Sequence, residues 1–153
     1  MITAQVENLT ANLEDLKAFF PKHWEELALN KDKVPLDPQY DVYLAKDARG
    51  EVLFVTVRKD GVLAGYFVGF IAPGLHYRTC LTLQMDIFYL APAERDGSPK
   101  AALILFREVL REAKRRGVQR AFFGSKTHRD ASVLFKRLGF EMVETYYSAW
   151  LGD

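Results

Sequence analysis

Residues 90–102, LAPAERDGSPKAA, have the composition of an anion-binding site. The segment joins a predicted strand to the start of a long predicted helix, where unpaired backbone N–H groups and the positive end of the helix dipole favour negative charge. Gly97 would let a ligand approach the backbone, and Arg95 and Lys100 would add positive charge. These features predict a site for a pyrophosphate group. The alternative is an ordinary capped helix that follows a polar turn.

Asp86 is the leading candidate for a general base. It lies inside the strand expected over Leu81–Leu90, and a carboxylate within a central strand is costly unless it is paired or lies in a solvated cleft. Strict alternation along that strand predicts that Asp86 and Phe88 face one side, and that Met85 and Ile87 face the other. The alternative role for Asp86 is a structural hydrogen bond or ion pair.

Other reactive side chains give weaker signals. His76, on the loop before this strand, is the second candidate base, although a single histidine on a loop is more often an ordinary surface residue. The three histidines are scattered along the chain, so they predict no metal site. The single cysteine, Cys80, excludes an internal disulfide and any multi-cysteine zinc site.

Length and composition indicate one globular domain. The chain has 153 residues, of which 49% are hydrophobic and 27% are charged, and its formal net charge is +1. This balance gives no electrostatic reason to expect binding to nucleic acid or to a membrane surface. The first residues lack the features of a signal peptide, and no apolar stretch approaches the roughly 18 residues that span a bilayer. We therefore expect a single cytoplasmic domain over residues 1–153.

The periodicity of apolar residues changes along the chain. Asp60 and Gly61 lie between two apolar runs and predict a hairpin, because a type I′ turn needs positive φ at both central residues. Ser98 and Pro99 predict the start of the long helix, and Gly117 predicts its end. The predicted helices cover residues 6–20 (ending at Pro21), 23–29, 98–116 and 130–138. The predicted strands cover residues 51–58, 62–72, 81–90, 118–124 and 141–151, with a further strand suggested at 42–45.

This order of elements predicts a mixed α/β (α+β) fold. The strands before residue 90 should form an antiparallel meander, and the strand–helix–strand unit over residues 81–124 should be a right-handed parallel crossover. The expected architecture is a central mixed sheet with helices on both faces.

Two segments at the expected separation resemble the GNAT superfamily of acyl-CoA N-acyltransferases, over roughly residues 40–151. The first is Leu90-x-Pro92-x-x-Arg95, where a central strand of that family runs into a phosphate-binding loop and then a helix. The second segment, DASVLFKRLGF, matches the pattern of a later helix of the family at Ala131, Leu134, Phe135, Gly139 and Phe140. The loop that contains Tyr77 and the ending YYSAWL are also similar to phage-encoded members.

The resemblance implies an acetyltransferase that binds acetyl-CoA and transfers its acetyl group to a primary amine by direct attack. Asp86 would steer or deprotonate the amine, the end of the 81–90 strand would hold the pantetheine, and the 95–101 loop would hold the pyrophosphate. The two N-terminal helices would build the wall of the acceptor site. The residues implied to bind the cofactor are Phe88, Tyr89, Leu90, Arg95, Asp96, Gly97, Ser98, Lys100, Ala101, Ser125, Ala131 and Phe135.

The sequence departs from the family pattern at two places. Ser98 and Lys100 stand where the phosphate loop of the family has its glycine positions, so either Lys100 reaches a phosphate itself or tight cofactor binding has been lost. Phe135 stands where many members have the tyrosine that protonates the leaving thiolate. Tyr146 or Tyr147, water, or the proton of the product amine would then serve, because a thiol is a good leaving group.

These departures support a rival hypothesis, in which the fold is retained to bind another protein and not for catalysis. A third and weaker hypothesis is a plain α/β domain whose likeness to the family is only architectural. The aromatic ending, TYYSAWLGD, could cover a partner subunit, which suggests a homodimer.

Overall fold

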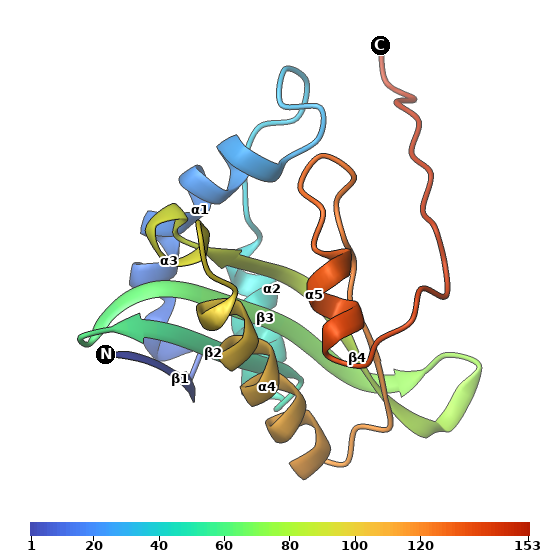
Figure 1. Cartoon of the computed structure of the whole chain (residues 1–153). Helices are drawn as coiled ribbons and strands as arrows, with labels where there is room; N and C mark the ends of the chain where they lie inside the picture. Colours follow the sequence, from blue (N-terminus) through green and yellow to red (C-terminus); the bar gives the residue numbers. More distant parts are fainter.

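A five-stranded sheet with helices on both faces organises the chain (Figure 1). The computed structural model describes all 153 residues. The strands are β1 (Ile2–Val6), β2 (Val52–Lys59), β3 (Val62–Gly74), β4 (Tyr77–Leu90) and β5 (Arg120–Phe122). The helices are η1 (Thr10–Asn12, a 3-10 helix), α1 (Leu13–Leu27), α2 (Tyr40–Ala48), α3 (Pro92–Arg95), α4 (Lys100–Arg115) and α5 (Ser132–Arg137).

The strands lie in the order β1-β2-β3-β4-β5, and all neighbours are antiparallel except β4 and β5. The antiparallel meander, the parallel strand–helix–strand unit and the mixed sheet are thereby confirmed. The hairpin between β2 and β3 is also confirmed, since Asp60 and Gly61 have φ angles of +50° and +83°. Positive φ at both central residues is the requirement of a type I′ turn.

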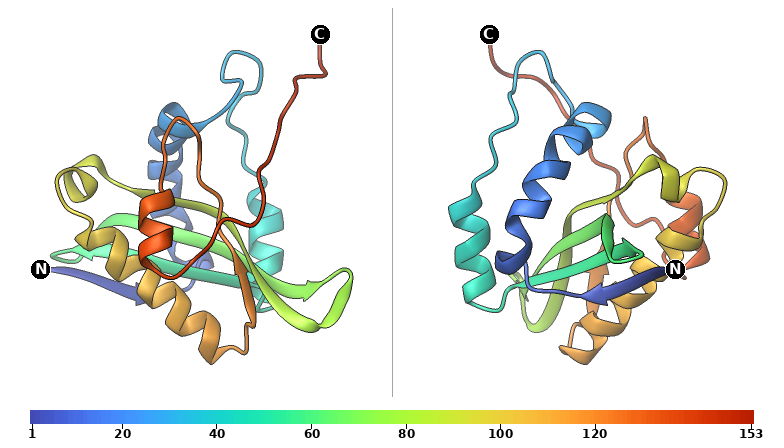
Figure 2. Two further views of the ribbon diagram at one scale, coloured as in Figure 1. Left: turned by 45° about the vertical axis from the view of Figure 1, so that its right-hand side comes forward. Right: turned by 90° about the vertical axis from the view of Figure 1, so that its left-hand side faces the viewer.

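Each face of the sheet has its own apolar core. Helices α4 and α5 cover one face, where Leu105, Phe106 and Phe135 pack against the sheet. Helices α1 and α2 cover the other face (Figure 2). There, Phe20 of α1 packs against Tyr66 of β3. Residues of β4 pack in both cores, so both helical layers help to fix the position of this strand. None of the helices is long and apolar enough to cross a membrane.

The N-terminal region differs from the sequence-based prediction. Residues 2–6 form the edge strand β1, paired with β2, and a single helix, α1, replaces the two predicted helices. Pro21 lies inside α1 instead of ending it. Proline removes one helical hydrogen bond, but the flanking residues Leu16 and Phe20 are buried against the sheet, and this tertiary packing outweighs the local preference.

The strand suggested at residues 42–45 is wrong, because these residues belong to helix α2. Tyr40 and Tyr43 both pack on the core below, and their spacing of three residues fits one face of a helix. The strand predicted over 118–124 is shorter, covering only Arg120–Phe122.

The strand predicted over residues 141–151 is also wrong for the single chain, in which this segment forms no strand. Residues 141–153 have no regular secondary structure and run away from the rest of the molecule (Figure 1). The segment has the alternation of a strand, but the structure gives it no neighbouring strand with which to form a ladder.

Candidate active site

Strand β4 contains a β-bulge at Asp86. Its register pairs Ile87 and Met85 with consecutive residues of β3, so Asp86 is an extra residue without a partner of its own. Met85 and Phe88 consequently pack on the α4 side of the sheet, whereas Ile87 packs on the α1 side. The strict alternation predicted for this strand is therefore wrong, because the bulge shifts it by one residue.

Strands β4 and β5 stay together over only a short length. Their parallel pairing joins Thr82–Gln84 to Arg120–Phe122 and goes no further. From Met85 to Leu90, β4 has β3 on one edge and no strand on the other. An extended ligand could therefore hydrogen-bond to the free backbone edge of β4, which includes Phe88–Leu90.

A short turn, Asp96–Pro99, leads from α3 into the N-terminus of α4. Gly97 has a φ of +85°, which favours glycine, and a Cβ at this position would meet no other atom within 4 Å. The surface above this turn is therefore open. Ser98 Oγ accepts a hydrogen bond of 3.2 Å from the backbone N–H of Lys100, which closes the start of the helix.

The same turn presents several unpaired donors. The N-terminus of α4 adds the positive end of the dipole of a 16-residue helix. The Lys100 side chain is exposed and forms no ion pair, so its charge is available to a ligand. Together these groups fit an anion such as a diphosphate. Four backbone N–H groups here donate no hydrogen bond within the chain, namely those of Gly97, Ser98, Ala101 and Ala102.

Arg95 is engaged differently from the other residues of the predicted phosphate loop. Its guanidinium donates hydrogen bonds to both carboxylate oxygens of Glu26 on α1, one of them 2.9 Å long, and to the carbonyl oxygen of Leu90 at 3.2 Å. Arg129 lies 3.3 Å from the same carboxylate. Burial alone would raise the pKa of Glu26. The hydrogen bonds from Arg95 and the charge of Arg129 outweigh this effect, so the pKa is lowered. Lys100, not Arg95, is therefore the unpaired cation of this loop.

Asp86 lies on the face of β4 that α2 covers, and the hydroxyl of Tyr43 donates a hydrogen bond to its Oδ2. The surrounding protein raises the pKa of Asp86 by partial desolvation, while the hydrogen bond from Tyr43 acts in the opposite direction. Burial and the adjacent carboxylate raise the pKa of Tyr43, so its hydroxyl stays protonated as the donor. A carboxylate that is open to solvent and has a raised pKa is suited to accept a proton.

On the same face of the sheet, His23 of α1 packs against residues of β3 and β4. Its Nδ1 lies 2.9 Å from the hydroxyl of Tyr66, and its ring stacks on Tyr89 at a centroid distance of 5.1 Å. Burial lowers the pKa of His23 from 6.5 to about 4. His23 is therefore neutral at pH 7 and is a packing residue, as the neighbouring aromatic rings indicate.

The lowered pKa of His23 predicts that the protein loses stability in mild acid. Between its unfolded value of 6.5 and its folded value of about 4, the unfolded chain binds more protons at this position, so the free energy of unfolding falls as pH drops. Urea unfolding should show a loss between about pH 7 and about pH 5 that is up to ~2 kcal/mol larger in the wild type than in His23→Gln. Equal losses in both proteins would contradict the burial of a neutral imidazole.

Phe135 lies in the core between α4, α5 and the sheet. Its ring is 5.3 Å from that of Phe106 and 6.3 Å from that of Phe88, measured between centroids, and its side chain is 7% exposed. It offers no polar atom to the end of β4. The hydroxyl that the family usually places here is therefore not supplied by this part of the chain.

Two other predicted cofactor contacts, Ser125 and Ala131, serve the local structure. Ser125 Oγ donates a hydrogen bond of 2.9 Å to Asp130 and accepts one of 2.7 Å from the N–H of Ala131. Asp130 in turn accepts a hydrogen bond of 2.9 Å from the N–H of Ser132, at the start of α5. These contacts fix the loop before α5, so any role of Ser125 in binding a cofactor would compete with them.

The structure does not bring the other two predicted catalytic residues near Asp86. His76 lies in the turn between β3 and β4, ten residues before Asp86, which corresponds to roughly 30 Å along a strand that rises about 3.3 Å per residue. Tyr146 lies in the C-terminal tail and is 80% exposed. Neither residue contacts Asp86 or Tyr43 within the chain.

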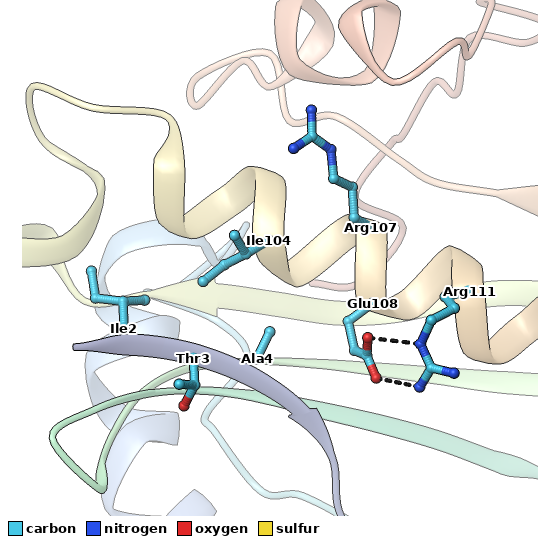
Figure 3. A pocket seen from close by; sticks show the side chains of 7 residues that line it. All are labelled: Ile2, Thr3, Ala4, Ile104, Arg107, Glu108 and Arg111. Carbon is cyan, nitrogen blue, oxygen red and sulfur yellow. Dashed lines mark hydrogen bonds and ion pairs between the residues drawn. The ribbon is translucent and has the colours of Figure 1, made fainter.

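A shallow pocket elsewhere on the molecule contains none of the predicted residues. It lies between β1 and α4 and is lined by Ile2, Thr3, Ala4, Ile104, Arg107, Glu108 and Arg111 (Figure 3). Glu108 and Arg111 pair with each other there through two hydrogen bonds. The pocket lies at the β1 edge of the sheet and shares no lining residue with the candidate site.

Sequence reasoning missed Tyr43 and Glu26. The spacing of Tyr40 and Tyr43 could have indicated a helix with an aromatic face, but the segment was interpreted as a possible strand. Glu26 gave no signal, because its importance depends on Arg95, which is 69 residues further along the chain.

The sequence matches no protein-family model, and a search of curated proteins found no match. Solved structures, in contrast, are similar over the whole chain. A GCN5-related N-acetyltransferase from Ralstonia eutropha superposes with a TM-score of 0.74 at 16% identity, covering 99% of this chain and 100% of that one. A ribosomal-protein-alanine N-acetyltransferase from Brucella melitensis gives 0.73 at 14% identity, covering 100% and 99%.

A predicted acetyltransferase from Clostridium acetobutylicum, solved with acetyl-CoA, gives a TM-score of 0.69 at 11% identity and covers 99% of this chain and 97% of that one. At such low identity the likeness establishes architecture and not activity. The superposition extends over nearly the whole of both chains in each case. The chain therefore has the fold of the GNAT acetyltransferases.

Proposed function

We propose that this protein transfers an acetyl group from acetyl-CoA to a primary amine by direct attack. The observation that carries the proposal is the free edge of β4 beyond Gln84, which leads through α3 to four unpaired backbone donors at the start of α4. An extended thiol arm and a diphosphate at its end fit these two features in that order. The similarity to acetyltransferase structures, one of them with acetyl-CoA, supports the same assignment.

The chain would bind acetyl-CoA mainly through its backbone. The edge of β4 at Phe88–Leu90 would hydrogen-bond to the pantetheine arm, and the N–H groups around Gly97 and Ala101 would hold the diphosphate. Lys100 would contribute a charged donor to a phosphate oxygen. Bound in this way, acetyl-CoA would supply an acetyl thioester on the side of β4 where the edge is free.

Asp86 would act on the acceptor amine. A primary amine is protonated at neutral pH and must lose that proton before its lone pair can attack. The Asp86 carboxylate, held by Tyr43 and open to solvent, would attract the cation and accept the proton, directly or through water. The nitrogen then bonds to the carbonyl carbon, the carbon–sulfur bond breaks, and the thiolate leaves with a proton from the product amine or from water.

The proposal is tested by measuring the thiol released from acetyl-CoA in the presence of primary amines of several classes: small amines, amino acids, amino sugars and peptides. We expect release that depends on at least one class of amine and saturates with its concentration, with N-acetylated product confirmed by mass. Thiol release at the same slow rate with and without every amine would contradict the assignment.

Two observations favour a second candidate function, the binding of another protein without catalysis. Arg95 is paired with Glu26, so its charge is not free to bind a phosphate. Phe135 places a buried ring where many acetyltransferases of this fold have the hydroxyl of a tyrosine. This candidate predicts that the purified protein neither binds acetyl-CoA nor releases thiol from it. The same assay, together with a binding measurement, separates the two functions.

A further inference from the structure

The C-terminal tail, residues 141–151, exposes an unusual amount of apolar surface. Tyr146, Tyr147 and Leu151 are 80%, 93% and 93% exposed, and Met142 is 82% exposed. A soluble chain seldom leaves so many large apolar side chains together in water unless something covers them. The tail therefore has the apolar side chains of a segment that is normally buried, but nothing in the single chain buries them.

The backbone of the tail is equally unsatisfied. No residue after Phe140 takes part in a backbone hydrogen bond, and the tail runs away from the sheet in an extended path (Figures 1 and 2). Near its end the tail contacts the N-terminal half of the chain, where Lys33 Nζ lies 5.0 Å from the ring centroid of Trp150. An extended segment with free N–H and C=O groups and alternating apolar residues is suited to join the edge of a sheet.

The two outer strands of the sheet are β1 and β5, and each has one free edge. Charge favours β5. The tail with its last two residues carries Glu141, Glu144 and Asp153 and no lysine or arginine, whereas residues 114–129, which include β5, carry six lysine or arginine residues and no carboxylate. Arg120 on β5 and Lys126 after it form no ion pair within the chain.

We propose that residues 141–151 form an added strand on the free edge of β5 in a second copy of this chain, so that two copies exchange their tails. Within one copy the tail turns toward Lys33 and away from its own β5, which leaves that edge open to the tail of a partner. In the exchanged pair the tail carboxylates lie beside Arg120 and Lys126, and the aromatic side chains are covered.

The surface available is sufficient for a stable pair. An aromatic residue buries about 150–250 Å², so the three aromatic residues of two exchanged tails would supply on the order of 1,000 Å², the size that a specific interface requires. The ladder adds backbone hydrogen bonds that are missing in the single chain. Two-fold symmetry satisfies both copies with the same contacts.

The first test is the molar mass in solution, measured by light scattering. We expect a dimer for the full chain, and a folded monomer both for a chain that ends at Phe140 and for Tyr147→Asp. Leu75→Asp is the matched control: Leu75 is 101% exposed at the turn between β3 and β4, outside the tail, and this variant should remain a dimer. A monomeric full chain, or a dimer that persists without the tail, would overturn the proposal.

The second test identifies the edge and the donor of the tail. Two chains that both carry Cys80→Ser are mixed, one with Gln119→Cys beside β5 and the other with Thr145→Cys in the tail. A flexible bis-maleimide that tolerates a shift of register should join the two different chains. A further chain carries both Gln119→Cys and Thr145→Cys, and cross-linking only within this single chain would overturn the exchange. In a third mixture, Thr3→Cys on β1 replaces Gln119→Cys, and cross-linking of the tail to Thr3→Cys instead of Gln119→Cys would overturn the assignment to β5.

Discussion

Asp86→Asn is expected to lower kcat/KM for acetyl transfer by a factor of about 100 or more, since a positioned general base contributes typically 10²–10⁴-fold. The substitution keeps the size of the side chain and its ability to accept a hydrogen bond from Tyr43, but removes the charge. Steady-state rates with a saturable amine measure the effect. Asp41→Asn, on the first turn of α2, is the matched control and should leave the rate unchanged.

Tyr43→Phe gives this prediction a second readout that a purely structural role would not produce. The hydrogen bond from Tyr43 lowers the pKa of Asp86 against the effect of burial, so its removal should raise that pKa further. The acidic limb of the kcat/KM profile, where activity falls as Asp86 becomes protonated, should therefore move to higher pH. Wild-type activity in Asp86→Asn, or an unmoved acidic limb in Tyr43→Phe, would remove Asp86 from the mechanism.

Phe106→Ala is expected to cost about 3–5 kcal/mol of unfolding free energy, as truncation of a fully buried phenylalanine does. The side chain is 0% exposed, and its ring lies 5.0 Å from Phe88 of β4 and 5.3 Å from Phe135 of α5, between centroids. Removing it would leave a cavity where α4, α5 and the sheet meet. Denaturant unfolding measures the loss.

Val133→Ala is the control for that experiment, since Val133 is 78% exposed on α5. Its effect should stay within about 0.5 kcal/mol, as for most surface substitutions. A loss below about 1 kcal/mol in Phe106→Ala would mean that α4 and α5 do not share one core as described.

The sequence predicted well the elements that depend on local patterns. The Asp60-Gly61 turn requires positive φ, and the long apolar stripe of α4 requires one buried face, so both could be recognised without knowing the rest of the fold. Pro21 and the 42–45 segment misled the prediction because their conformation is decided by packing on the sheet. The strand predicted over residues 141–151 is absent for a similar reason, because alternation indicates a strand but does not identify the neighbouring strand that must pair with it.

The same division holds for the candidate site. Asp86 and the turn at Gly97 could be recognised by residue type and position. The structure places Asp86 in the last part of β4 and Gly97 in the turn between α3 and α4. The bulge at Asp86 was not predictable, because it is visible only in the register with β3. The pairing of Arg95 could not be predicted for a related reason: its carboxylate partner, Glu26, comes from a helix that is distant in the sequence.

Thermal unfolding with and without acetyl-CoA tests the central claim most directly. At a hundredfold excess over Kd, binding should stabilise the folded protein by about 2.7 kcal/mol, which raises Tm by several degrees. At one fixed concentration the rise should be smaller for Lys100→Ala and unchanged for Lys114→Ala, a control at the other end of the same helix. A Tm that does not move even at millimolar acetyl-CoA would contradict the account, because the turn before α4 would then hold no cofactor.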